Sequence, residues 1–388
     1  MTAALVRMLG DFDLAEELVQ EALLEAIEHW PKEGIPEKPG AWLLTTARRK
    51  AVDQMRRQAR FRDKLAQLEG AGMRDDTAEG DDRLRLIFTC CHPALSREAQ
   101  VALTLRAVAG LTTIEIARAF ITSEATIAQR IVRAKRKIVD ANIPYRVPEE
   151  RDMAERLEEV LAVLYLMFNE GYLATTGEQA TRRDLAEDAA WLAGLMVRLM
   201  PGEPEVLGLL ALMRLHLARA RARFDDAGNL VLLQDQDRNR WDQERIGSAM
   251  VLLQRAATLH RSGPYQLQAA IAACHAEAGT WGETDWRQIV ALYDALLELM
   301  PSPVVELNRA IARRHRDGAH AALDDVDRLA EALGGYYLFH ATRAELLRDL
   351  DREPEARAAL RRALELTANP AERALLQRRM DGLNTENE

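Results

Sequence analysis

The chain has 388 residues, a net charge of −9 and only 5% aromatic residues. It is long enough for two or three domains with cores of their own, and its richness in Ala, Leu, Arg and Glu favours an all-α fold. Three cysteines imply no disulfide framework and fit a reducing cytoplasm, no signal peptide is visible, and no apolar run is long enough to span a bilayer.

The charge is unevenly distributed along the chain. Residues 1–148 carry 23 Lys and Arg against 21 Asp and Glu, whereas the remainder carries 29 against 40. The segment 48–64 alone has 8 basic and 2 acidic residues. A locally basic first part joined to an acidic second part indicates two parts with different tasks.

Two strong helices are predicted at the start of the chain. Residues 11–30 form the first, with Leu23, Ile27 and Trp30 on its apolar face and acidic residues outside. The segment PKEGIPEKPG that follows predicts a loop, and a basic helix is expected from about Ala41. Gly/Asp/Glu-rich residues 65–81 lack periodicity and predict a linker.

Residues 111–138 have the pattern of two short helices joined by a tight turn. Thr112 and Glu115 form a capping box for the first helix, and Ser123 is a good N-cap for the second. The turn has Ile121 where Gly is usual, which predicts a different turn geometry. The apolar residues of the second helix recur at the spacing of one buried stripe: Ile127, Ile131, Ala134 and Ile138.

The other face of this second helix is basic. Five basic residues lie between Arg130 and Lys137 with no acid among them. A basic, amide-bearing second helix is typical of helix-turn-helix DNA readers; an ordinary amphipathic helix with a solvated face is the alternative. The candidate DNA-contacting residues are Thr126, Gln129, Arg130, Arg133 and Lys137.

These parts, in this order, resemble a known family. The runs DFDLAEELVQE and AWLLTTARRKAVDQMRR resemble region 2 of bacterial sigma factors of the extracytoplasmic-function (ECF) type. The helix-turn-helix is similar to their region 4. Family members usually begin one helical stretch earlier, so the resemblance implies that Met1 opens partway through the first helix of region 2.

The resemblance implies a promoter-specificity subunit that binds core RNA polymerase and promoter DNA. The helix-turn-helix would read the −35 element in the major groove, where Arg pairs with guanine and Gln with adenine. The melted −10 element would be bound by Arg48, Arg49, Lys50, Asp53, Arg56 and Arg57. Core RNA polymerase would be contacted by Asp13, Glu16, Glu17, Gln20 and Glu21, for which a merely solvated helix face is the alternative.

The chain from Pro148 onward has the character of helical repeats. Turn residues recur at Pro201, Pro264, Pro301, Gly334 and Pro370, and after a first interval of 63 residues their spacing is close to the roughly 34 residues of a tetratricopeptide repeat. An insertion at 224–241 explains an oversized first interval. The predicted domains are therefore region 2 at 1–64, a linker at 65–81, region 4 at 82–147 and a repeat domain at 148–388.

The whole layout resembles an ECF subgroup with a C-terminal tetratricopeptide-like extension. This implies control through the extension, with a small DGPF-type protein as a candidate partner and no membrane partner. No enzyme is predicted, because the histidines are scattered and there is no Gly-rich phosphate loop, and no cofactor or metal is expected. The rival functions are an autonomous helix-turn-helix activator with a sensor domain and a repeat scaffold.

Three short motifs allow two interpretations each. Cys90-Cys91-His92 can be a metal site or a buried helix end, and the helix end is favoured because adjacent cysteines share one ion poorly. Residues 169–172, NEGY, can be a binding site or a polar contact between helices, and the contact is favoured. The acids Asp225, Asp226, Asp235 and Asp237 can gather a cation, but a solvated loop or a lid fits their spacing better.

Overall fold

The computed structural model describes residues 1–59, 78–120, 122–172, 179–225 and 227–385. These residues are mainly helical, and their one β-type contact is an isolated antiparallel bridge between Phe224 and Leu230. The predicted all-α fold is confirmed. None of the helices described is long and apolar enough to cross a membrane. The chain divides into two compact units, Met1–Leu166 and Met167–Glu388.

The first unit contains the helices of the predicted regions 2 and 4. A π-helical turn at Leu105–Ala109 follows α5, and α8 crosses from this unit into the second. The helices are α1 (Thr2–Leu9), α2 (Phe12–Glu33), α3 (Pro39–Ala59), α4 (Ala78–Cys90), α5 (Arg97–Thr104), α6 (Thr113–Ala119), α7 (Glu124–Asp140) and α8 (Glu150–Tyr172).

The start of α2 is set by a local cap. The Asp11 carboxylate accepts hydrogen bonds from the backbone N–H groups of Asp13 and Leu14, at 2.9 and 3.1 Å. These two donors would otherwise lack partners in the first turn, so the cap stabilises the helix by about 1 kcal/mol. The helix predicted from residue 11 is confirmed, with Asp11 as its N-cap.

The end of α2 lies beyond the prediction. The sequence predicted a loop from Pro31, but the helix passes through this proline and ends at Glu33. A proline removes only its own N–H from the helical ladder, so one more turn can close. The Gly34 N–H donates to the Trp30 carbonyl at 3.0 Å. Trp30 also packs edge-on against Trp42 of α3, with ring centroids 5.6 Å apart, so α2 and α3 meet at this end.

The short helix α1 joins the two predicted regions. Leu5 is fully buried, and Gly10 ends the helix in the left-handed conformation (φ 66°) that glycine adopts without strain. The Tyr145 hydroxyl lies 2.9 and 3.0 Å from the carbonyl oxygens of Ala3 and Asp82. The sequence predicted separate domains at 1–64 and 82–147, but here α1 packs on α4 and both regions belong to one compact unit.

The beginning and end of α4 test two predictions. Residues 65–77 of the predicted linker lie outside the described residues, whereas its last four residues, 78–81, form the first turn of α4. The helix ends at Cys90. Cys90 and Cys91 are completely buried, and burial raises the pKa of the Cys91 thiol to about 11. The interpretation as a buried helix end is confirmed.

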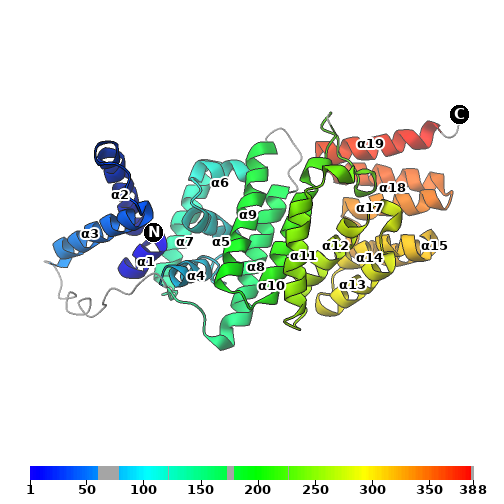
Figure 1. Cartoon of the computed structure of the whole chain (residues 1–388). Coiled ribbons are helices and arrows are strands. Elements are labelled where there is room, and N and C mark those ends of the chain that lie inside the picture. Colours follow the sequence, from blue (N-terminus) through cyan, green and yellow to red (C-terminus); the bar gives the residue numbers. More distant parts are fainter. Residues whose placement is uncertain (60–77, 121, 173–178, 226, 386–388) are drawn as a thin grey trace. The chain divides into compact units, whose positions relative to one another are not determined.

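The second unit consists of successive helices in the predicted repeat region. In Figure 1 the helices from α10 to α15 follow one another side by side, each packing on its neighbour in the chain. They are α9 (Gln179–Leu199), α10 (Pro204–Ala218), α11 (Gln243–Ala257), α12 (Pro264–Glu277), α13 (Trp286–Leu299), α14 (Pro303–Asp317), α15 (Ala319–Asp327), α16 (Ala330–Leu333), α17 (Tyr337–Asp349), α18 (Glu353–Leu366) and α19 (Pro370–Thr385).

The predicted turns agree with this helix order. Pro264 and Pro370 are first residues of helices, and Pro301 and Gly334 lie in the breaks before α14 and α17. Proline at the first helical position lacks an N–H that would have no partner there in any case. The prediction that one helix precedes and another follows each of these turns is confirmed. The second compact unit begins at Met167, inside α8, and the domain boundary at 148 stays a prediction.

Helices α10 and α12 approach each other unusually closely. The Glu205 carboxylate on α10 accepts hydrogen bonds from the backbone N–H groups of Tyr265 and Gln266, at 2.9 and 3.1 Å, and so caps α12 from outside. One turn further along α10, a Cβ atom at Gly208 would lie 2.7 Å from the Gln266 nitrogen. Only glycine leaves room for this contact between the two backbones.

The insertion between α10 and α11 is irregular, as predicted. It contains two short 3₁₀ turns, Leu233–Asp235 and Arg238–Arg240. Asp225 receives the backbone N–H of Asn229 at 2.7 Å and serves as a local turn residue, while Asp226 lies outside the described residues. No group of His, Cys, Asp and Glu suited to a metal ion occurs in the part of the chain that the structure describes.

The NEGY segment, residues 169–172, forms the end of α8, and its Tyr172 packs against neighbouring aromatic rings. Tyr172 stacks on Phe168 with centroids 5.4 Å apart and lies 5.1 Å from the His216 ring. The Arg223 guanidinium carbon sits 4.0 Å above the Tyr172 ring. These contacts favour the interpretation as a packing element between helices.

Candidate nucleic-acid interface

The turn between α6 and α7 is built from the predicted caps. The Thr112 N–H donates to Glu115 Oε2 at 2.7 Å, and the Glu115 N–H donates to Thr112 Oγ1 at 3.2 Å. The Ser123 hydroxyl accepts the Thr126 N–H at 3.1 Å, so α7 begins at Glu124. Both caps are confirmed, whereas Ile121 in the turn lies outside the described residues.

One side of α7 is buried and another is open to solvent. Ile127 and Ile131 are 0% and 5% exposed, and Ala134 and Ile138 continue the predicted buried stripe. The proposed DNA-contacting residues share an arc of about 100° around the helix axis. Arg130 is half-buried, and the other four are exposed: Thr126, Gln129, Arg133 and Lys137. The helix therefore presents amide, hydroxyl and guanidinium groups together, as a major-groove reader requires.

Lys135 lies on roughly the opposite side of α7 and is not part of this surface. Its side chain is only 10% exposed, and its ammonium lies 2.6 Å from Asp13 and 3.3 Å from Glu16 of α2. Arg106 adds a longer ion pair of 3.8 Å to Glu16. Region 4 thus contacts two of the acids predicted to contact polymerase, which sequence reasoning did not foresee.

The basic helix α3 is partly neutralised by α2. Arg49 donates to Glu25 at 2.9 Å, and the Lys50 ammonium lies 3.2 Å from both Glu21 and Glu25. Burial lowers the pKa of Lys50, but its hydrogen bonds to these two glutamates outweigh burial and hold the pKa above its ordinary value. Arg48 is half-buried.

The remaining predicted −10 residues continue along α3. The helix backbone includes all three of them, but their side chains lie outside the described part: Asp53, Arg56 and Arg57.

The acidic face of α2 is divided between paired and open groups. Asp13 and Glu16 pair with Lys135, and Glu21 pairs with Lys50. Glu17 and Gln20 are exposed. One predicted polymerase residue, Glu21, therefore contacts one predicted −10 residue, Lys50.

An apolar surface on α2 contradicts one prediction. Leu23 and Ile27 were expected on the buried face, but they are 37% and 69% exposed, and the neighbouring Leu24 and Ile35 are 61% and 72% exposed. A hollow of about 430 Å³ beside them is lined by Leu23, Ala26, Ile27, Trp30, Pro31 and Ile35. Exposed apolar clusters of this kind mark interaction surfaces. The consecutive Leu23 and Leu24 gave a signal, since one buried stripe cannot hold both.

Three family models match the chain. Residues 1–61 match the model of Sigma-70 region 2, and residues 85–138 match the model of Sigma-70, region 4. Residues 156–257 match a family of unknown function, DUF6596. The first two matches cover α1 to α3 and most of α4 to α7, and the third covers most of α8 through α11.

Curated relatives agree with these matches. An uncharacterized protein of Rhizobium meliloti (strain 1021) is 46% identical over 393 residues, covering 99% of this chain and 93% of the relative. The ECF RNA polymerase sigma factor SigL of Mycobacterium tuberculosis (strain ATCC 25618 / H37Rv) is 31% identical over 137 residues, covering 34% of this chain and 77% of SigL. The ECF RNA polymerase sigma factor SigK of Mycobacterium ulcerans (strain Agy99) is 31% identical over 150 residues, covering 35% and 78%.

The helix order, the capped helix-turn-helix and these similarities all lead to one assignment. The first 140 or so residues carry regions 2 and 4 in the predicted order, and the sequence continues into a helical extension, whereas the matches to the two mycobacterial proteins cover about a third of the chain. The chain belongs to the family of ECF RNA polymerase sigma factors, with a C-terminal extension that includes the DUF6596 segment.

Proposed function

We propose that this sigma factor reads the −35 element with α7 and the melted −10 element with α3. The reading residues on α7 are Thr126, Gln129, Arg130, Arg133 and Lys137. Those on α3 are Arg48, Arg49, Lys50, Asp53, Arg56 and Arg57, whose arginines would track the phosphates of a single strand. Core RNA polymerase would be bound through Asp13, Glu16, Glu17, Gln20 and Glu21 of α2, together with the exposed apolar residues Leu23, Leu24 and Ile27.

The observation that carries this proposal is the composition of the exposed arc of α7. The arc begins at the capped N-terminus of the helix, and its side chains are polar or basic and, apart from the half-buried Arg130, open to solvent. The buried stripe fixes the helix on the rest of region 4. Arg–guanine and Gln–adenine contacts each contribute about 1–3 kcal/mol of discrimination. Polymerase and promoter DNA are cytoplasmic, so we propose that the protein acts there.

The experiment is run-off transcription with purified core RNA polymerase on the promoter upstream of the protein's own gene. A discrete transcript that needs the protein is expected. Arg133→Ala should reduce it at least tenfold, whereas the control Arg151→Ala removes an exposed arginine of α8 and should leave it unchanged. Tight duplex binding without polymerase, and no transcript, would instead favour an autonomous activator.

We further propose that the extension regulates this activity. Because Arg97 pairs with Glu159 at 2.8 Å, the first half of α8 is part of the first unit, and a useful truncation keeps α8 and removes residues 173–388. Transcription that differs between this truncation and the full chain is expected. Equal promoter-specific transcription from both proteins would refute regulation by the extension. A small DGPF-type protein as its partner stays a prediction, testable by adding that protein to the same reaction.

A further inference from the structure

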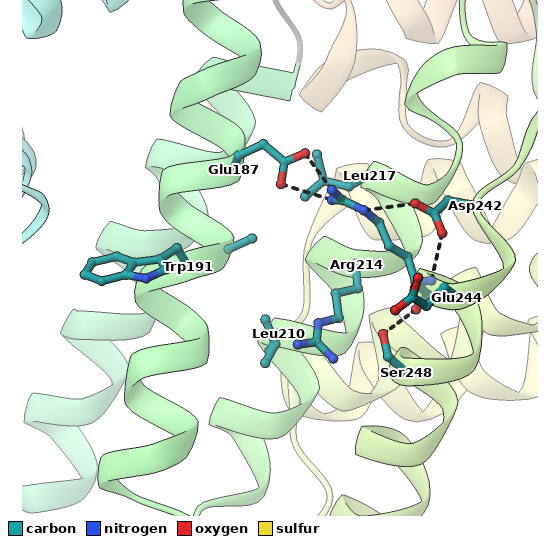
Figure 2. A pocket seen from close by; sticks show the side chains of 10 residues that line it. Glu187, Trp191, Leu210, Arg214, Leu217, Asp242, Glu244 and Ser248 are labelled. Carbon is teal, nitrogen blue, oxygen red and sulfur yellow. Dashed lines mark hydrogen bonds and ion pairs between the residues drawn. The ribbon is translucent and has the colours of Figure 1, made fainter.

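A cavity in the extension is not explained by polymerase or promoter binding. It has a volume of about 510 Å³ and lies between α9, α10 and the start of α11 (Figure 2). All its lining residues fall within the DUF6596 segment. The volume is in the range of small-molecule sites, roughly 300–1,000 Å³. Its lining combines apolar side chains of α10 with two arginines and three carboxylates.

The two arginines in this cavity differ in their partners. Arg245 is neutralised: it lies 3.0 Å from Glu187 and 3.3 Å from Asp242. Hydrogen bonding to Glu187 outweighs partial burial and raises the pKa of Arg245 above its ordinary value. This arginine is therefore a structural link between α9 and α11, and has little capacity left for a ligand.

Arg214 has no such neutralisation. It is half-buried on α10, and among the described residues it has no hydrogen bond or ion pair. Burial, and then the positive charge of Arg245, lower its pKa below the ordinary value. A partly buried cation that lies near a second cation and lacks a carboxylate is stabilised by an added anion. In Figure 2 no dashed line reaches the guanidinium of Arg214.

The rest of the cavity limits the kind of anion. Leu210 and Leu217 are 3% and 5% exposed and form an apolar wall beside Arg214. The lining carries three carboxylates against two arginines, so a doubly charged phosphate would meet more repulsion than a singly charged carboxylate. The ring of Trp191 points away from Arg214 in Figure 2. A single carboxylate attached to an apolar body matches both the one open arginine and the wall.

We propose that this cavity is a binding site for a small organic monocarboxylate. The guanidinium of Arg214 donates two parallel hydrogen bonds to the carboxylate, the geometry for which arginine is suited. The apolar body of the ligand lies against Leu210 and Leu217. The site is independent of the promoter-reading surfaces, and its ligand would bind whether or not polymerase is present.

Titration of the full chain by calorimetry tests the proposal directly. The probes are 3-phenylpropionate and hexanoate, with 3-phenylpropionamide and hexanamide as neutral counterparts and inorganic phosphate as a plain anion. For ligands of this size we expect a Kd of about 1 mM or tighter for at least one carboxylate. The matching amide and phosphate should bind at least tenfold more weakly, because they lack the single carboxylate or the apolar body.

Variants separate ligand binding from folding. Arg214→Gln should weaken carboxylate binding at least tenfold, Arg214→Lys should weaken it less, and Arg287→Gln, an exposed arginine of α13 outside the cavity, should leave it unchanged. Because Arg214 has no hydrogen bond or ion pair among the described residues, Arg214→Gln should unfold at the same or a higher temperature than the unaltered chain. The carboxylate should raise the Tm of the unaltered chain and of Arg287→Gln, but not that of Arg214→Gln.

Four results would overturn the proposal. They are no binding of either carboxylate below about 10 mM, equal binding of the amides, binding that ignores Arg214→Gln, or phosphate binding as tightly as the carboxylates. A lowered Tm of Arg214→Gln with unchanged circular dichroism would also count against it, because it would mean that Arg214 has a structural partner.

Discussion

His275 illustrates how burial and neighbouring positive charges set the pKa of a residue. Its ring stacks on Trp281 with centroids 5.7 Å apart and meets Trp286 edge-on at 5.4 Å. Burial, and then the charges of Arg219 and Arg238, lower its pKa from 6.5 to about 4. The folded protein thus keeps this imidazole neutral at pH values where the unfolded chain binds a proton.

A pH-dependent stability follows from this lowered pKa. Above pH 6.5 His275 is neutral in both the folded and the unfolded chain, and its contribution to the free energy of unfolding is fully present. This contribution is lost as the pH falls from about 6.5 to about 4, because the unfolded chain then binds a proton that the folded chain does not. Between pH 7 and pH 5 the unaltered chain should lose about 2 kcal/mol more stability than His275→Gln. Chemical denaturation followed by tryptophan fluorescence at the two pH values measures this difference.

The control for this experiment is His320→Gln, which removes an exposed histidine from the same unit. The stability of His320→Gln should depend on pH as that of the unaltered chain does, since this substitution leaves His275, His216 and the other buried groups in place. If His275→Gln kept the full pH dependence, another residue would be responsible for it.

At the residue scale, the sequence predicted local contacts better than distant ones. The capping residues Thr112 and Ser123 act on partners three positions away, so their roles could be predicted from spacing. Lys135 looked like one more member of a basic helix face. Its burial depends on Asp13 and Glu16, more than a hundred residues earlier, and no periodicity reveals such a partner.

At the scale of single helices, the contact between α10 and α12 allows a sharp test. Gly208→Ala would place a Cβ atom 2.7 Å from the backbone nitrogen of Gln266, so one helix must shift. We expect a loss of about 1–3 kcal/mol in the stability of the second unit. Denaturant unfolding followed by the tryptophans of that unit measures it.

Gly247→Ala is the matched control for this substitution. Gly247 lies inside α11, and a Cβ atom there would meet nothing within 4 Å. The substitution should stabilise the helix by about 0.5–1 kcal/mol, because alanine is the better helix former. Equal effects at the two positions would contradict the close approach at Gly208.

The charges of α7 lead to a second element-scale prediction. Four of its five basic residues from Arg130 to Lys137 remain available to DNA phosphates, because Lys135 is paired with α2. Their contribution to the slope of log K against log salt is then about −3.6, rather than about −4.5 for five. Arg133→Ala should make the measured slope shallower by about 0.9, whereas Lys135→Met should leave it unchanged.

Fluorescence anisotropy with a duplex carrying the −35 element, measured at several salt concentrations, gives these slopes. Arg151→Ala again serves as the charge-matched control outside α7. A shallower slope for Lys135→Met would mean that this lysine reaches DNA.

The helix boundaries show where element-scale prediction failed. Pro31 was expected to end α2, but a proline in the last turn removes a single hydrogen bond and the helix continues to Glu33. The acidic residues before Asp82 suggested a linker up to residue 81. Acids are favourable in the first turn of a helix, so the same composition suits the start of α4 at Ala78.

At the scale of the whole molecule, the order of parts was predictable and their association was not. Regions 2 and 4 and the helical extension each follow from local patterns. The burial of α1 against α4, and the inclusion of the first half of α8 in the first unit, depend on surfaces formed only after folding. Local patterns therefore give no sign of a division inside α8, and the domain boundary at Pro148 stays a prediction.

The contact between regions 2 and 4 predicts a competition with polymerase. Lys135 occupies Asp13 and Glu16, two of the acids proposed to bind polymerase, so removing its charge should free them. Lys135→Met, which keeps most of the apolar stem, is expected to bind core polymerase several-fold more tightly. Surface plasmon resonance with immobilised core polymerase measures this, with Arg151→Met as the control.

A decrease in polymerase affinity would assign Lys135 a different role. Weaker binding by Lys135→Met, with region 4 still folded, would mean that this lysine helps to position α2 for polymerase rather than competing with it.

The ion pair between Lys135 and Asp13 also has a meaning on the scale of DNA. Promoter elements at −10 and −35 are about 25 base pairs apart, which is roughly 85 Å along straight duplex. Helix α7 is only about 25 Å long, and its Lys135 touches α2, the direct neighbour of α3. The two helices proposed to read the promoter cannot span such a distance while this contact holds. On a correctly spaced promoter, the free energy of binding the second element would be available to open the ion pair. On a promoter with the wrong spacing, the ion pair would stay formed.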